Sequence, residues 1–141
     1  MMMKLFSVEE DKVRLTQGKT MIWEVKIPEI IVIAVSADIM NGDNETTIYS
    51  IFDIKGNAFH LDFIGLKGEN YPIVDNFFEK KYNLRITEDF FGKTKIFYPE
   101  LLRGVYPYNK SIFTWMIRGF HNAGGGILNK RVREYIKEQQ E

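Results

Sequence analysis

The chain has 141 residues, of which 45% are hydrophobic and 14% aromatic, and this composition predicts one folded domain, 1–141, rather than a disordered segment. It contains no cysteine, which excludes disulfides, thiolate metal sites and cysteine nucleophiles. The 19 Lys and Arg balance the 19 Asp and Glu, so the formal net charge is zero. We find no signal peptide and no apolar run of about 20 residues, the length that spans a membrane, so we expect a soluble cytoplasmic protein.

The amino-terminal half predicts a mainly antiparallel β-meander of about six strands. Short alternations of apolar and polar side chains, bounded by turn residues, run through this half of the chain. The strands that they predict are 4–8, 12–17, 20–27, 30–35 and the two arms of a hairpin within 46–65. Residues 30–35 are apolar at every position and rich in β-branched side chains, which favours a central strand covered on both faces. The predicted sheet therefore occupies residues 4–65.

The hairpin within residues 46–65 allows its register to be predicted. A two-residue turn at Gly56-Asn57 would close it and would place Asp53 opposite His60. This register gathers an apolar face, made of Phe52, Ile54, Phe59, Leu61 and Phe63. The other face is half polar and carries Tyr49, Ile51, Asp53, His60, Asp62 and Ile64. A slip of one residue would scatter the apolar set over both faces, so the apolar pattern favours this pairing.

The carboxy-terminal half predicts helices around one further pair of strands. Apolar side chains recur at helical spacing in 71–82, between Asn70 as a candidate N-cap and Asn83 as a candidate C-cap. The other expected elements are strands at 84–87 and 94–98, a helical turn at 99–103, and a final amphipathic helix at 128–139. Residues 109–120 fit a helix better than a strand, and the alternation of Phe113, Trp115 and Ile117 leaves a strand open. The expected fold class is α+β, with the sheet packed against helix 71–82 and a helical C-terminal region.

Three side chains on the polar face of the predicted hairpin form the first candidate site. Asp53 faces His60 there, and Asp62 is a diagonal neighbour. A carboxylate that orients an imidazole can serve acid–base chemistry or metal binding. We favour an ordinary cross-strand charge pair, because the sequence places no further metal ligand beside it. The three residues are therefore assigned to partner binding, with no catalytic or metal role.

Other motifs give no chemistry that names a reaction. The loop with Asp38, Asp43 and Glu45 is rich in oxygen ligands but lacks the spacing of a calcium-binding loop. A solvated turn is favoured, a protein contact is the next alternative, and calcium binding is the last. The glycines at 124–126 precede a helix but do not match a phosphate-binding loop. Two histidines and no nucleophile motif leave little for a catalytic triad. We expect no cofactor and no metal, and we disfavour an enzyme.

Residues 90–121 combine aromatic and basic side chains. Five positive charges stand against one negative charge, Glu100, among nine aromatic residues. This mixture suits base stacking with phosphate contact, and it suits an acidic protein surface equally well. Tyr106 and Tyr108 flank Pro107 in a predicted connection, so we predict that both rings are at least partly exposed and belong to a recognition surface. The alternative is that both rings fold back over the final helix and cover Tyr135 and Ile136.

The functional hypothesis is a non-enzymatic protein-binding module. Its most concrete form is an inhibitor or immunity-type protein that neutralises a protein partner such as a bacterial toxin. The residues assigned to partner binding are Asp38, Asp43, Glu45, Asp53, His60, Asp62, Tyr106 and Tyr108. The alternative is a nucleic-acid-binding protein or small nuclease-like enzyme that uses residues 90–121 or the Asp53, His60 and Asp62 group, although the net charge of zero disfavours nucleic acid.

Overall fold

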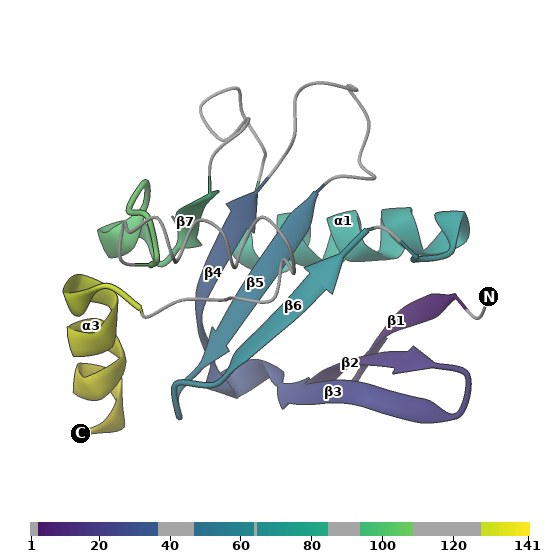
Figure 1. The fold of residues 1–141 in the computed structure, drawn as a ribbon, viewed down its shortest axis with the longest axis horizontal. Coiled ribbons are helices and arrows are strands. Elements are labelled where there is room, and N and C mark those ends of the chain that lie inside the picture. The colour runs from purple at the N-terminus through teal and green to yellow at the C-terminus, as the bar shows by residue number, and fades with distance from the viewer. Residues whose placement is uncertain (1–2, 37–46, 64, 85–93, 109–127) are drawn as a thin grey trace.

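A computed structural model describes residues 3–36, 47–63, 65–84, 94–108 and 128–141 (Figure 1). The predicted α+β class is confirmed. The strands are β1 (Lys4–Glu9), β2 (Lys12–Gln17), β3 (Thr20–Lys26), β4 (Ile30–Ser36), β5 (Ile48–Asp53), β6 (Ala58–Asp62) and β7 (Thr94–Tyr98). The helices are α1 (Tyr71–Tyr82) and α3 (Lys130–Gln140), with 3-10 turns η1 (Ile27–Glu29), η3 (Gly68–Asn70) and η5 (Glu100–Leu102). None of the helices in these ranges is long and apolar enough to cross a membrane.

The six strands predicted in residues 4–65 belong to two antiparallel sheets rather than one. The first sheet has the order β1-β2-β3, and the second has the order β6-β5-β4-β7. Pro28 in η1 separates β3 from β4, because proline has no N–H to donate to a continuing strand ladder. The chain then turns into the second sheet, which stands over the first in Figure 1.

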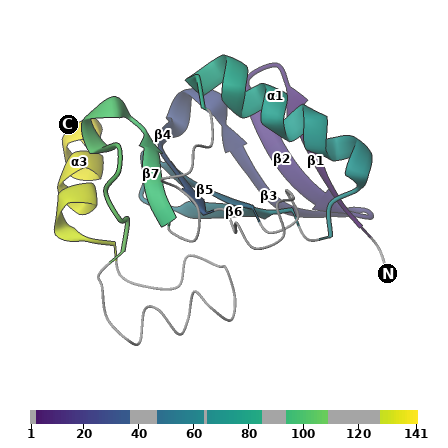
Figure 2. The same ribbon diagram turned by 90° about the horizontal axis from the view of Figure 1, so that it is seen from above.

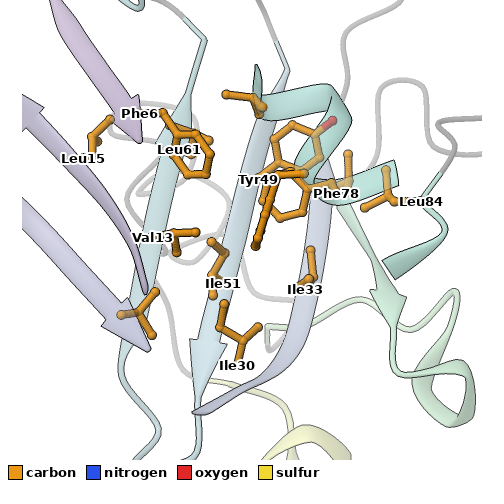
Figure 3. Close-up of a cluster of buried hydrophobic side chains, with 14 of the residues drawn as sticks. Phe6, Val13, Leu15, Ile30, Ile33, Tyr49, Ile51, Leu61, Phe78 and Leu84 are labelled. Carbon is orange, nitrogen blue, oxygen red and sulfur yellow. The ribbon is translucent and has the colours of Figure 1, made fainter. Parts of the chain in front are cut away.

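One core fills the space between the two sheets and α1 (Figure 3). The ring of Tyr49 stacks on that of Phe78 from α1, with centroids 4.2 Å apart and planes inclined by 9°. Stacked aromatic pairs contribute to stability beyond the area that they bury. The Tyr49 hydroxyl donates to Asp75 on the same helix, so this buried phenol keeps a hydrogen-bond partner.

A second core covers the opposite face of the β6-β5-β4-β7 sheet. Val32 and Ala34 of β4 pack there with Phe52 of β5 against Val132 and Ile136 of α3. Their neighbours on β4, Ile33 and Val35, point into the first core. The prediction that residues 30–35 form a central strand with both faces covered is confirmed.

The predicted register of the β5–β6 hairpin is wrong. Ile51 pairs with Phe59 and Ser50 with His60, so Asp53 does not face His60. The connection is a three-residue loop, 54–56, closed by a hydrogen bond from the Asp53 N–H to the Asn57 carbonyl at 3.0 Å. Tyr49 and Ile51 therefore share the inner face with Phe59, Leu61 and Phe63, while Phe52 faces the second core and Ile54 lies in the loop.

The Asp53 side chain explains this choice of loop. Its carboxylate accepts hydrogen bonds from the backbone N–H groups of Lys55 at 3.0 Å and Asn57 at 2.8 Å. Aspartate at the first position and glycine at the fourth are typical of a type I turn, and Gly56 adopts the positive φ of 88° that ends such a loop. The Asp-x-x-Gly pattern therefore outcompetes a two-residue turn at Gly56-Asn57.

Helix α1 has the predicted bounds, and its C-cap Asn83 has the predicted left-handed conformation with φ 56°. Asn70 precedes the helix, but its side chain does not cap it. Instead the fully buried Asn70 amide accepts from the Phe6 N–H at 2.6 Å and donates to the Phe6 carbonyl at 3.0 Å. This amide joins the start of α1 to the edge of β1.

The predicted elements after α1 are confirmed where the structure describes them. They are β7, the turn η5 followed by Gly104 with φ 87°, and α3, whose N-cap Asn129 accepts from the Val132 N–H at 3.0 Å. The predictions for 85–87 and 109–120 lie outside the described residues.

Replacing Asn70 with alanine should lower the free energy of unfolding by about 2–4 kcal/mol, because both buried peptide groups of Phe6 lose their partner. Denaturation in urea measures this. The control is Glu69→Ala at the exposed neighbouring position, which should change stability by less than about 0.5 kcal/mol. Equal stability of the two variants would contradict a structural role for the amide.

Candidate protein-binding surface

The structure separates Asp53 from the other two residues of the first predicted site. Asp53 is 4% exposed at the end of β5, where its carboxylate holds the loop. The ring Nδ1 of His60 lies 3.0 Å from the Ser50 hydroxyl on the neighbouring strand, and Asp62 follows two residues along β6. The predicted Asp53–His60 pair is therefore not formed. No group of three His, Asp or Glu residues that could hold a metal ion occurs within the described ranges.

The partial exposure predicted for Tyr108 is wrong, since the residue is 2% exposed and shares the second core with Ile136, as the alternative expected. Its ring packs against that of Phe52 at 6.4 Å, and its backbone forms an isolated bridge with Leu128. The connection after η5 crosses the face of the β6-β5-β4-β7 sheet that carries the second core, and Tyr108 lies in that core together with Val132 and Ile136 of α3. Tyr106 is half-buried beside it, with ring centroids 6.0 Å apart.

The remaining assigned residues, Asp38, Asp43 and Glu45, lie outside the described residues. So do 90–93 and 109–121 of the basic and aromatic segment. In the part of that segment which is described, Phe97 is buried beneath the Arg103 guanidinium, whose central carbon lies 4.6 Å from the ring centroid.

Three connections meet at one end of the molecule and form a surface that includes Asp53. They are the β1–β2 turn, η1 and the β5–β6 loop, and the last two lie together at the lower edge of Figure 1. The Ile27 N–H donates to the Asp11 carbonyl at 2.7 Å, and the Ile54 N–H donates to the Glu29 carbonyl at 2.9 Å. These bonds fix the connections relative to one another. We call this the turn surface; its charged residues are Glu9, Glu10, Asp11, Lys12, Glu24, Lys26, Glu29, Asp53 and Lys55.

Two hollows indent the turn surface. One, of about 290 Å³, lies between β3 and the β5–β6 loop and is floored in part by Val25 and Phe59. The other, of about 520 Å³, lies over the turn Glu9-Glu10-Asp11. Lys12 lines both, so the two hollows are neighbours on one surface.

The turn surface is acidic, with six carboxylates against three lysines, or 3 − 6 = −3. Arg14 on the adjoining strand face contacts Glu9 at 3.3 Å and Glu24 at 3.0 Å, and Lys12 lies 3.6 Å from Glu24. Burial opposes ionisation of Glu24, but the hydrogen bond from Arg14 and the two positive charges hold its pKa below the ordinary value. The exposed carboxylates at the tip of the turn are those of Glu9, Glu10 and Asp11.

This arrangement suits recognition of positive charge better than a reaction. Its charged groups stand on turns joined by backbone hydrogen bonds and on the strand residues beside them, and they include no histidine or hydroxyl nucleophile. Fixed carboxylates can pair with Arg and Lys side chains of a partner at low entropic cost. Comparison with protein-family models, curated proteins and solved structures finds no match for this chain.

The sequence points to Asp53 but not to the residues that lie beside it on the turn surface. Lys12 at the start of β2, Glu29 in η1 and Lys55 in the β5–β6 loop are far apart in the chain, and only the fold brings them together. A partial signal exists, because Glu9-Glu10-Asp11, Pro28-Glu29 and Asp53-x-x-Gly56 are all turn sequences. The relative orientation of the two sheets makes these turns neighbours, and this orientation cannot be predicted from the local sequence.

Replacing Glu24 with glutamine should destabilise the fold at neutral pH. A carboxyl whose pKa falls on folding stabilises the protein above its unfolded pKa, near 4.5, and this contribution is lost as the pH falls through the lowered pKa. The stability difference between wild type and Glu24→Gln should therefore be present at pH 7 and disappear in acid. Urea denaturation at several pH values measures it, with the exposed Glu69→Gln as control. A difference that does not change with pH would contradict the ion-pair account.

Replacing Tyr108 with alanine should lower the free energy of unfolding by about 3–5 kcal/mol, as expected for removal of a buried ring. Tyr106→Ala should cost less, because that ring is only half-buried. Chemical denaturation of both variants tests the assignment. If Tyr108→Ala were as stable as wild type, its place in the second core would be wrong.

Proposed function

We propose that the chain is a non-enzymatic protein-binding module of the inhibitor or immunity type. In this proposal it neutralises a protein partner, such as a bacterial toxin, by covering a basic active-site cleft. The observation that carries the proposal is the turn surface, where six carboxylates stand against three lysines on connections that the backbone holds in place and on the strand residues beside them.

The exposed tip of the turn surface makes the first contact in this proposal. Glu10 and Asp11 meet Arg or Lys side chains lining the partner's cleft, and complementary charge raises the rate of association. The hollow beside Lys12 then receives a side chain of the partner. Because Asp53 already holds its loop, little ordering accompanies binding.

Asp38, Asp43 and Glu45 remain predicted contributors to the same function. His60 and Asp62 remain so too, although they lie on β6 rather than on the turn surface. The nucleic-acid alternative has less support from the described residues. Phe97 and Tyr108, two of the rings proposed to stack on bases, are buried in the cores.

The test of this proposal is site-directed photo-crosslinking followed by binding measurements. A photoreactive residue at position 10 of the full chain should crosslink one protein in lysate of the source cell, whereas the same residue at position 69 should not. With that protein purified, Glu10→Lys/Asp11→Lys should weaken binding at least about tenfold and relieve inhibition of the partner's activity.

The matched control is Glu69→Lys/Glu79→Lys, which reverses two exposed carboxylates on the α1 side of the molecule. It should bind and inhibit as wild type does. If both double variants lost binding equally, the loss would reflect the overall charge of the protein, and this result would contradict the proposed surface. Failure of position 10 to crosslink any protein would also count against the function.

A further inference from the structure

The edge of β1 is nearly sealed by the chain itself. In a regular antiparallel pair, every second residue of an edge strand points its N–H and C=O away from the partner strand. On β1 these include Lys4 and Phe6. The Lys4 N–H donates to the Gly65 carbonyl at 2.7 Å, the Lys4 carbonyl accepts from the Lys67 N–H at 3.4 Å, and the Asn70 amide holds both groups of Phe6.

Val8 is the next residue in this alternation. Its pairing with Val13 of β2 is regular, so its own peptide groups point outward like those of Phe6. Within the described ranges, no hydrogen bond from another segment reaches them. Residues 65–70, which cover the edge at Lys4 and Phe6, are followed by α1, and this helix lies across β1 in Figure 2.

An apolar hollow opens beside this unpaired position. It has a volume of about 370 Å³ and is lined by Val8, Ile73, Asn76, Phe77, Lys80 and Lys81. Val8 is 42% exposed and Ile73 46%, although both are large aliphatic side chains. The hollow falls within the range of about 300–1,000 Å³ that is usual for ligand sites.

The charge of this hollow is positive. Lys80 and Lys81 line it and no carboxylate does. In the described part of the chain neither lysine forms an ion pair. Glu9, the neighbour of Val8, pairs with Arg14 at 3.3 Å on the opposite face of the sheet, so it does not neutralise them.

We propose that this groove, defined by the six lining residues, binds an extended acidic segment of a partner protein, which adds to the edge of β1. The backbone of the segment pairs with the peptide groups of Val8, as in other cases of strand addition. One apolar side chain enters the hollow between Ile73 and Phe77, and acidic side chains meet Lys80 and Lys81. The Asn76 amide can donate to or accept from the same segment.

A partner peptide fits better than a second copy of this chain. In a twofold-symmetric dimer the same patch faces itself, so Lys80 and Lys81 of both copies would be brought together. An acidic segment instead supplies the opposite charge. The groove lies on the α1 side of β1 and shares no residue with the turn surface, so the two proposals can fail separately.

The experiment is selection of random dodecapeptides displayed on phage against the immobilised full chain, followed by fluorescence polarisation with the synthetic peptides selected. We expect peptides that combine Asp or Glu with aliphatic residues. Lys80→Glu/Lys81→Glu should weaken their binding at least about tenfold. The control Lys130→Glu/Arg133→Glu reverses two exposed charges on α3 and should leave binding unchanged.

Two further measurements extend the test, and the second uses the wild-type chain, so it does not depend on how any variant folds. Val8→Pro removes the N–H at an edge position where proline is tolerated, and it should also weaken binding. With the wild-type chain, addition of a selected peptide should slow hydrogen exchange of the Val8 amide and shift the NMR signals of Ile73 and Phe77. Selection of no peptide, equal binding by the two charge-reversal variants, or an unchanged Val8 amide would overturn the proposal.

Discussion

The apolar character of β4 on both faces is the constraint on which the rest of the structure depends. Val32, Ile33, Ala34 and Val35 are all fully buried, whereas an antiparallel sheet commonly leaves one face to water. Two covering layers are therefore required. The first sheet and α1 supply one, and α3 with residues 102–108 supplies the other. With both faces occupied, the turns at the ends of the strands and the sheet edges become the places where binding surfaces can form.

The same constraint explains why sequence predicted the elements well and one register badly. Helix 71–82, its C-cap Asn83 and the central strand follow from local periodicity and capping, which act within a few residues. The β5–β6 register does not, because β5 is buried on both faces and its apolar residues fit either one. Tyr49 and Ile51 satisfy the inner face as well as Phe52 and Ile54 would. The decision then falls to the loop, where the Asp53 carboxylate and the positive φ of Gly56 favour three residues over two.

Functional residues were harder to predict than elements because their neighbours come from tertiary contacts. The sequence identifies Asp53, but the partner that it predicts for Asp53 follows from the wrong register. A local argument gives the wrong exposure for Tyr108, since a proline-containing connection is usually exposed. The second face of the sheet reverses that expectation, because something must cover Phe52, and Tyr108 does so. Whether a connection is buried thus depends on whether other elements cover the sheet face beneath it. A local sequence pattern does not contain that information.

The way the sheet edges are covered explains why the groove beside β1 stays open. Unpaired strand edges invite association, and proteins usually block them. On β7, Ile96 exchanges backbone hydrogen bonds with Gly104 and Val105, each at 2.8 Å, and on β6 the His60 carbonyl accepts from the Trp23 indole at 3.0 Å. On β1 the Asn70 side chain takes the place of a strand residue at Phe6, and the chain then leaves the edge to begin α1. The helix places Ile73 and Phe77 beside the next edge position instead of a peptide group. Val8 therefore has an apolar neighbour, and no other segment in the described part of the chain bonds to its outward peptide groups. An added strand needs outward peptide groups next to an apolar hollow. Both occur at Val8, just beyond the part of the β1 edge that residues 65–70 cover.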